Sequence, residues 1–156
     1  MHDISRRDAI RLLSLTAAIG VWGTATARAE STPLVVYKDP SCGCCEKWIA
    51  HMKANGFAPA VTNTRDVAGI KRQYHVPDAL ASCHTALVGG YVIEGHVPAA
   101  DVKRLLAQKP KGVVGLTIPG MPSSAPGMDM TPFTPYTVLS FDAQGKTMVF
   151  GEHRRG

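Results

Sequence analysis

The chain has 156 residues, of which 45% are hydrophobic and 19% charged, and its formal net charge is +5 at pH 7. This length suffices for one domain with an ordinary core, and the small, dispersed positive charge gives no support to nucleic-acid binding. The sequence has no phosphate-binding glycine loop, no paired carboxylates and no Ser-His-Asp set. The sequence therefore contains no motif that supports a kinase or hydrolase function.

Residues 1–29 have the features of an export signal. A basic start that contains the pair Arg6-Arg7 is followed by an uncharged run over residues 12–27, and an A-x-A cleavage site ends at Ala29. The apolar run is shorter than the ~20 residues that span a bilayer. The arginine pair indicates the twin-arginine export route, and an ordinary Sec signal with a chance arginine pair is the alternative.

Cleavage after Ala29 leaves residues 30–156 as a single exported domain, which we expect in the periplasm without a stable membrane anchor. The cleaved segment carries four of the 17 basic and two of the 12 acidic residues, so 13 basic and 10 acidic residues remain, a net charge of +3. This small positive charge says little about the protein's partners.

The first elements of the domain predict a strand, a turn and a helix. Residues 34–37, LVVY, form a short apolar run rich in β-branched side chains, and the turn residues Asp39-Pro40-Ser41 follow. Apolar residues then recur at helical spacing, namely Trp48, Ile49 and Met52. Asn55-Gly56 is a typical C-terminal cap for this helix.

The next segments predict a thioredoxin-like α/β domain. Residues 57–62 form a second strand, parallel to the first because a helix connects them, and residues 67–74 form a short helix. Gly89-Gly90 joins two strand-like runs as a tight hairpin, and residues 99–108 form another helix. The order βα-β-α-ββ-α is that of a thioredoxin-like domain.

Three of the four cysteines lie in the stretch DPSCGCC, at the start of the first helix. The positive end of a helix favours thiolates, which are both nucleophiles and metal ligands. As disulfides, Cys42–Cys45 with Cys44–Cys83 is the least strained pairing, but three cysteines within four positions are a poor scaffold, because a disulfide that closes a short loop stabilises little. In a thioredoxin-like fold the loop that carries Cys83 faces this helix start, so we expect one four-cysteine site.

Two histidines lie near this site in the sequence. His84 follows Cys83, and His96 follows the second strand of the hairpin. Each is a candidate ligand, hydrogen-bond donor to a ligand, or proton carrier, and an ordinary surface or hydrogen-bonded histidine is the alternative. Three further histidines, His51, His75 and His153, are expected at the surface, the last in a polar tail.

A loop rich in Pro, Gly and Ser carries Met121, Met128 and Met130. Thioethers are soft ligands for Cu(I) and need no deprotonation, whereas methionines that only fill gaps are the alternative. The segments YTVLSF and KTMVF then predict a terminal hairpin that extends the sheet. Trp48 and Tyr74 are assigned to the core, because helical spacing explains them.

Four cysteine thiolates can bind Cu(I), zinc or an iron–sulfur cluster, and this set of ligands alone does not show which of them is bound. Structural zinc usually takes two separated Cys-x-x-Cys pairs, whereas the adjacent Cys44 and Cys45 are difficult to direct at one tetrahedral ion. Adjacent thiolates that point in different directions suit bridging between several Cu(I) ions.

Three blocks, YKDPSCGCCEKW, SCHTALVGGYVIEGHVPAADVKRLL and GLTIPGMPSSAPGMD, resemble the CopG-type periplasmic copper-resistance proteins. This metal-binding family was long known only as a domain of unknown function and is unrelated to the plasmid repressor of the same name. The resemblance covers about Leu34 to Phe150. It implies a thioredoxin-like fold, a copper site formed by Cys42, Cys44, Cys45 and Cys83, and a copper redox role.

The favoured function is therefore periplasmic binding of Cu(I), in multinuclear form and with Cu(I)/Cu(II) redox, in copper resistance and homeostasis. Copper ions are the expected partners, together with periplasmic copper chaperones or efflux components, and no catalytic residue is assigned. The alternative is a thiol-disulfide oxidoreductase in which Cys42 attacks a substrate disulfide and Cys45 resolves it. Against it, the loop that carries a cis-proline in redox thioredoxins reads SCHTA here. A structural zinc or iron–sulfur protein is a third possibility.

Overall fold

This computed structural model describes residues 30–154 of the chain. The first element in this range is strand β1 (Thr32–Lys38). Its side chains alternate between the core and the opposite face of the sheet, with Leu34, Val36 and Lys38 buried. The predicted export signal, residues 1–29, lies outside the described residues. Within the described range, no helix has the length and hydrophobicity that crossing a bilayer requires.

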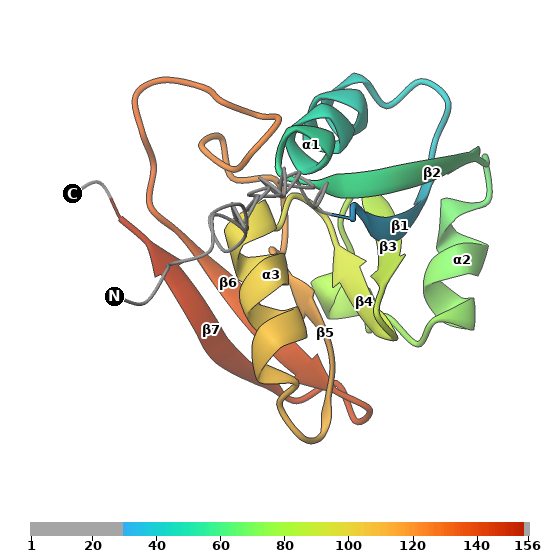
Figure 1. Cartoon of the computed structure of the whole chain (residues 1–156), viewed down its shortest axis with the longest axis vertical. Coiled ribbons are helices and arrows are strands. Elements are labelled where there is room, and N and C mark those ends of the chain that lie inside the picture. The colour runs from blue at the N-terminus through green and yellow to red at the C-terminus, as the bar shows by residue number, and fades with distance from the viewer. Residues whose placement is uncertain (1–29, 155–156) are drawn as a thin grey trace, which may run out of the picture.

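Seven strands form one mixed sheet in the order β2-β1-β3-β4-β5-β6-β7, with the helices packed against it (Figure 1). The elements after β1 are α1 (Gly43–Ala54), β2 (Phe57–Asn63), α2 (Val67–Gln73), a 3₁₀ turn (Asp78–Leu80), β3 (His84–Val88), β4 (Tyr91–Glu94), α3 (Ala99–Gln108), β5 (Val113–Thr117), β6 (Tyr136–Asp142) and β7 (Thr147–His153). The predicted α/β fold in one domain is confirmed, and the order of elements up to α3 is consistent with the thioredoxin-like prediction.

The locally encoded elements agree closely with the sequence-based prediction. Asn55 caps α1, and Gly56 follows it with a φ of +87°, a conformation that glycine adopts at little cost. Strands β1 and β2 are parallel, as the helical crossover requires. The residues Gly89 and Gly90 both have positive φ and join β3 to β4 as an antiparallel hairpin.

Strand β5 was missed by the sequence-based prediction. It lies between β4, with which it is parallel, and β6, with which it is antiparallel. Gly115 makes this pairing possible, because a Cβ atom there would lie 2.1 Å from the carbonyl oxygen of Val92. The predicted terminal hairpin, β6 and β7, is therefore joined to the sheet through a strand that only tertiary pairing reveals.

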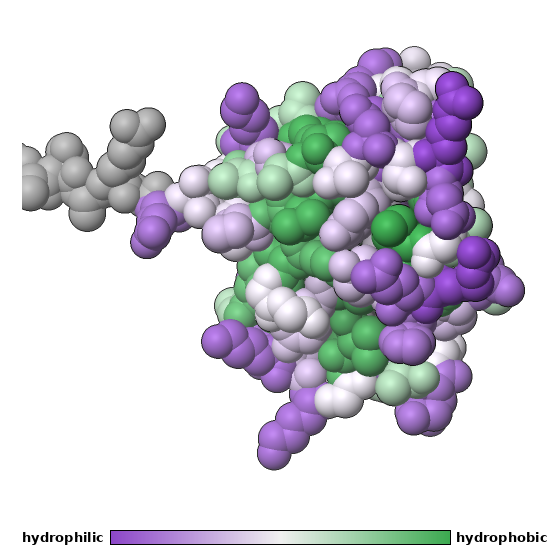
Figure 2. All heavy atoms as spheres, turned by 90° about the vertical axis from the view of Figure 1, so that its right-hand side faces the viewer, coloured by the Kyte–Doolittle hydropathy of each residue, from purple (hydrophilic) through white to green (hydrophobic). Residues whose placement is uncertain are grey.

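Two apolar clusters hold the sheet and helices together. The larger one includes Trp48 and Met52 from α1 and Val102 and Leu105 from α3, all fully buried against the strands. The smaller one contains Val76, Leu80, Val92 and Phe141, with half-buried Tyr74 against it. The prediction that Tyr74 lies in the core is thus only partly correct. On the face shown in Figure 2, hydrophobic and hydrophilic side chains are interspersed.

Two histidines expected at the surface are held by tertiary contacts instead. The backbone N–H of Ala99 donates to His51 Nε2 over 3.1 Å, so His51 is half-buried between α1 and the start of α3. His153 is the last residue of β7 rather than part of a tail. Its Nε2 lies 2.7 Å from Asp101 Oδ2, and its ring stacks on Tyr136 with centroids 4.7 Å apart. His75 is exposed, as expected.

Candidate metal centre

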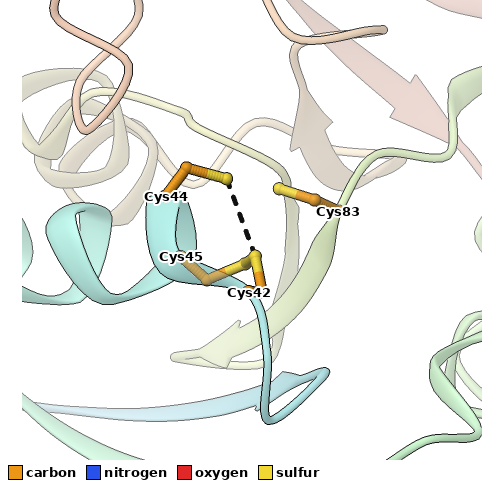
Figure 3. A group of neighbouring side chains, drawn as sticks. All are labelled: Cys42, Cys44, Cys45 and Cys83. Atoms are coloured by element: carbon orange, nitrogen blue, oxygen red, sulfur yellow. Dashed lines mark hydrogen bonds between the residues drawn. A yellow bond between two sulfur atoms is a disulfide. The ribbon is translucent and has the colours of Figure 1, made fainter.

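Strand pairing brings the four cysteines together. In the antiparallel β1–β3 pair, Lys38 lies opposite His84, so the end of β1 and the start of β3 share one edge of the sheet. The chain that leaves β1 forms the turn and the first turn of α1, where three cysteines lie, and Cys83 directly precedes β3. All four sulfur atoms lie within 4.8 Å of one another (Figure 3).

Two of the four sulfurs are joined. Cys42 and Cys45 form a disulfide with Cα atoms 5.4 Å apart, whereas Cys44 and Cys83 are free. One half of the least strained disulfide pairing is therefore present and the other is not. The sulfur of Cys44 lies 3.6 Å from that of Cys42. In this state two thiols, rather than four, are available as ligands.

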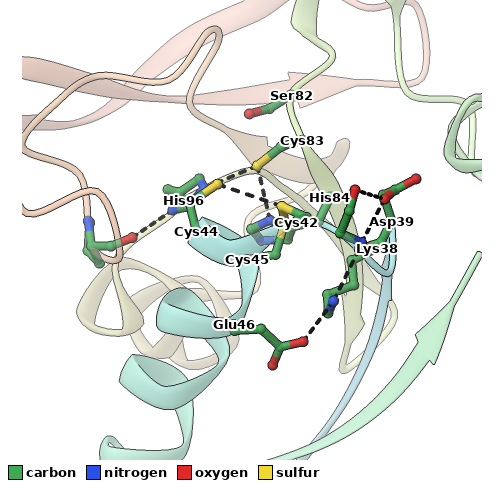
Figure 4. Close-up of a disulfide and its surroundings, with 12 residues drawn as sticks. Lys38, Asp39, Cys42, Cys44, Cys45, Glu46, Ser82, Cys83, His84 and His96 are labelled. Carbon is green, nitrogen blue, oxygen red and sulfur yellow. Dashed lines mark hydrogen bonds and ion pairs between the residues drawn. A yellow bond between two sulfur atoms is a disulfide. The ribbon is translucent and has the colours of Figure 1, made fainter.

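Cys83 faces two imidazoles (Figure 4). Its sulfur lies 3.1 Å from His96 Nε2 and 3.4 Å from His84 Nδ1. Burial, followed by the neighbouring Cys44, raises the pKa of the Cys83 thiol to about 12. This thiol is therefore protonated at neutral pH, and a cation must displace its proton before the sulfur can act as a thiolate.

The imidazole of His96 is held by the loop that carries the methionines. His96 Nδ1 donates to the carbonyl oxygen of Pro126 over 2.7 Å, and burial lowers the pKa of the ring below its ordinary value. In this neutral tautomer the lone pair belongs to Nε2, which points at Cys83. A backbone carbonyl that orients one ring nitrogen while the other faces a ligand is typical of metal-binding histidines.

His84 is fully buried beneath the cysteines. Burial, followed by the nearby His96, lowers the pKa of His84 well below its ordinary value, so the ring is neutral. The ring packs on Trp48 with centroids 4.3 Å apart. Among the buried side-chain nitrogen and oxygen atoms of residues 30–154, only His84 Nε2 lacks a hydrogen-bond partner. Together with Cys83 and His96, His84 forms a second group whose ligand atoms lie within 4.8 Å of one another.

The methionines of the loop lie in different surroundings. Met121 lines a surface pocket together with Ala81, Ser82, Cys83 and Gly120, so this methionine and one of the cysteines line the same cavity. Met128 is half-buried, and Met130 is 57% exposed. The structure thus brings the first of the three methionines to the cysteine site.

Gly127 joins the methionine-bearing loop to helix α1. A Cβ atom at this position would lie 2.7 Å from the backbone nitrogen of Trp48 and 3.0 Å from the carbonyl oxygen of Cys44. The φ of Gly127 is +88°, which L side chains rarely adopt. The loop therefore lies directly against the backbone of the cysteine-bearing turn, next to the Pro126 carbonyl that holds His96.

Replacing Gly127 with Ala is expected to destabilise the protein and to move the loop. The left-handed conformation costs about 1–2 kcal/mol for a residue with a Cβ atom, and the clash with α1 adds roughly 1–3 kcal/mol. Gly120→Ala is a matched control, because Gly120 has a φ of +73° but no atom within 4 Å of its Cβ position. Thermal unfolding should show a larger loss for Gly127→Ala. Equal losses would mean that close packing on α1 contributes nothing.

Two buried charged residues near the site were not anticipated. Lys38 is 1% exposed, and its Nζ lies 2.7 Å from Glu46 and donates to the carbonyl oxygen of Asp39 (Figure 4). Glu94 is completely buried at the end of β4. The available sequence signal for Lys38 was the alternation of β1, in which Lys38 follows Leu34 and Val36 at a core-facing position. For Glu94 it was the apolar run of β4, in which the two residues before Glu94 are buried.

Comparison with solved structures relates this chain to known proteins. The structure of copper resistance protein CopG in Form 1 is 38% identical and superposes with a TM-score of 0.74, covering 80% of this chain and 98% of that chain. Form 2 of the same protein is 36% identical with a TM-score of 0.75, covering 80% of this chain and 100% of the other. The chain belongs to the CopG family of copper resistance proteins.

The family assignment agrees with the resemblance found in the sequence. Residues 80–128 of this CopG-family chain also match a family described as "Protein of unknown function, DUF411". This segment starts just before Cys83, includes His84 and His96, and ends at Met128. No curated protein matches the chain.

Proposed function

We propose that this protein binds Cu(I) through Cys42, Cys44, Cys45 and Cys83 and acts in copper resistance. The observation that carries the proposal is the convergence of four sulfurs within 4.8 Å, one of them from a separate loop. Soft thiolates favour Cu(I) over hard cations, and the related solved structures are of a copper resistance protein. A dithiol enzyme has no need for the third and fourth sulfurs.

The bound copper is proposed to be multinuclear. Cys44 and Cys45 are adjacent in the first turn of α1, where successive side chains leave the helix about 100° apart. Two such sulfurs are poorly placed to bind one ion tetrahedrally but can each bridge two ions. Bridging also occupies the sulfurs and so protects them from oxidation.

Histidines and a methionine extend the set of donors at this site. His96 presents Nε2 to Cys83, and the buried His84 has a nitrogen without a partner among the described residues. Met121 shares the Cys83 pocket. We assign these residues to secondary copper contacts or to the support of copper ligands, together with Met128 and Met130 of the same loop.

The disulfide supports the redox part of the proposal. Closing the Cys42–Cys45 disulfide releases two electrons and two protons, and two Cu(II) ions that take up these electrons become two Cu(I) ions. The neighbouring Cys44 and Cys83 remain free to hold a Cu(I) product. Copper here is the substrate or cargo of the protein, delivered and removed by periplasmic chaperones or efflux components.

The test is metal analysis of protein expressed with residues 1–29 and purified anaerobically from the periplasm, combined with a count of free thiols. We expect copper, few free thiols until the metal is removed, and a mass that shows cleavage near Ala29. Zinc or iron in place of copper would contradict the proposed cargo. Recovery of uncleaved protein from the cytoplasm alone would contradict the proposed export.

A second candidate function is thiol-disulfide exchange by Cys42 and Cys45. The observation that favours it is the disulfide between them at the start of α1. The free thiol of Cys83 and the two imidazoles beside it are unexplained by this function. The copper proposal accounts for all of them and is therefore preferred.

Replacing Met121, Met128 and Met130 together with Leu is expected to change the rate of copper transfer but not the final copper content. Thioethers bind Cu(I) more weakly than thiolates, so they affect access more than affinity. Stopped-flow transfer from a Cu(I) donor measures the rate. Met148→Leu is the control, because Met148 is 68% exposed on β7, outside the loop. Identical rates in the triple variant and the wild type would show that the methionines only pack.

A further inference from the structure

Glu94 is a buried carboxylate whose hydrogen bonds reach the segment that carries Cys83. It ends β4 and is 0% exposed, and both of its oxygens are occupied. Oε1 pairs with Lys71 Nζ and accepts from the backbone N–H of Ser82 at 2.6 Å, and Oε2 accepts from Thr85 Oγ1 at 2.7 Å. Burying an ionised carboxylate is costly unless partners of this kind surround it.

One of these partners belongs to the segment that carries Cys83. Residues 81–83 lie between the 3₁₀ turn and β3 and belong to neither a helix nor a strand. Their backbone conformation is therefore not maintained by a regular ladder of hydrogen bonds. The bond from the Ser82 N–H to Glu94 ties the residue next to Cys83 to the sheet.

Further contacts hold the same segment against its surroundings. Ser82 Oγ donates to the carbonyl oxygen of Gly120 over 2.9 Å, at the start of the methionine-bearing loop. Thr117 Oγ1 donates to the carbonyl oxygen of Leu80 over 2.9 Å. A Cβ atom at Gly95, the residue after Glu94, would lie 2.5 Å from Ser82 Oγ, so the two segments are in close contact. Glu94 supplies the charged anchor of this arrangement.

The position of Cys83 matters because the other three sulfurs come from one rigid unit. Cys42, Cys44 and Cys45 lie at the start of α1, and only Cys83 reaches the site from elsewhere. Its distance from the other sulfurs depends on contacts outside the helix. A shift of about 1 Å in one ligand is enough to spoil a metal site.

We propose that Glu94, paired with Lys71, is a positioning residue that holds the Ser82–Cys83 segment so that the Cys83 sulfur meets the three cysteines of α1. The proposal rests on the proposed copper-binding function and adds a residue to it that touches no sulfur. The Lys71 ammonium balances the Glu94 charge, so that no uncompensated carboxylate lies in the protein interior. This balance explains why a buried ion pair, rather than a lone carboxylate, forms the anchor.

The variant that tests the proposal is Glu94→Gln, which keeps the size of the side chain but removes its charge. Asp101→Asn is the matched control. Asp101 is 4% exposed and paired with Arg104 and His153, and none of these contacts involves the cysteines or the segment before β3. Both variants lose one buried carboxylate, so a purely structural effect should appear in both. The double variant Glu94→Gln with Lys71→Met is used should Glu94→Gln alone not fold, because it leaves neither half of the ion pair unpaired in the interior.

The first measurement uses copper-free, reduced protein. Iodoacetamide labelling followed by peptide mass spectrometry reports the alkylation rate of Cys83 separately from that of the three cysteines of α1. At a temperature well below unfolding, we expect Cys83 to react severalfold faster in Glu94→Gln than in the wild type or Asp101→Asn. The second measurement is Cu(I) affinity by competition with a chelator, which we expect to fall by about tenfold or more in Glu94→Gln.

The two measurements distinguish failure of the positioning role of Glu94 from failure of the proposed copper-binding function. Wild-type values of both quantities in Glu94→Gln, or equal changes in Asp101→Asn, would overturn the positioning role. Failure of the wild type to bind Cu(I) would contradict the proposed function, and the alkylation rates would still decide whether Glu94 positions Cys83.

Discussion

Fully reduced protein is expected to take up more than one Cu(I) per chain, whereas protein with the Cys42–Cys45 disulfide closed is expected to take up at most one. The sulfurs of a disulfide are not thiolates, so only Cys44 and Cys83 then remain, with His96 beside them. Two thiolates cannot form the bridged arrangement that four allow. Titration with Cu(I) against a competing chelator under anaerobic conditions, before and after reduction, measures both values.

The control for this titration is a double variant, Cys42→Ser with Cys45→Ser, which cannot form the disulfide. Its copper uptake should be low and should not respond to reductant. Saturation of the reduced wild type at one ion or fewer would contradict the multinuclear site. Equal uptake by the reduced and oxidised wild type would show that Cys42 and Cys45 are not ligands.

Cys83→Ser is expected to lose most of its copper while any disulfide reductase activity persists. Cys83 is one of four converging sulfurs, so its removal takes away a ligand, and Cys44→Ser should reduce copper loading to a similar extent. Neither residue belongs to the Cys42–Cys45 pair that would carry out disulfide exchange. Copper per chain by elemental analysis and turnover of a model disulfide are measured on the same samples.

Comparison with Cys42→Ser completes the test, because this variant should lose both copper loading and reductase activity. Met148→Leu is a useful control, since it removes an exposed sulfur on β7 but leaves the four cysteines and their contacts in place. Unchanged copper loading together with retained reductase activity in Cys83→Ser would reverse the preference for copper binding over thiol-disulfide exchange.

Several elements of this protein follow from local sequence. The helix that begins at Gly43, within the DPSCGCC stretch, is encoded by the spacing of Trp48 and Met52 and ends at its Asn55-Gly56 cap. The Gly89-Gly90 pair encodes a hairpin, because both residues adopt positive φ at little cost. These signals act over a few residues and need no knowledge of the rest of the chain. The clustering of three cysteines at the helix start is equally local.

Strand β5 and the buried charges could not be predicted in this way. The run from Val113 to Thr117 contains a glycine and is short, and it becomes a strand because β4 and β6 supply hydrogen bonds on both sides. Glu94 is buried only because Lys71, Ser82 and Thr85, which come from other parts of the chain, compensate its charge. A single sequence does not show which residues far apart in the chain will come into contact.

The sequence by itself determined the residue types of the candidate site, its place at the start of α1 and the soft-ligand character of its sulfurs, because thiol chemistry and helix signals are properties of short stretches. The approach of Cys83 to the other sulfurs was predicted only through the expected fold, and the tertiary structure shows what produces it, namely the register that sets Lys38 opposite His84. Only the tertiary structure decided that His96 is held by the Pro126 carbonyl and faces Cys83. These distances depend on strand pairing and side-chain contacts between segments far apart in the chain, which local propensities do not specify.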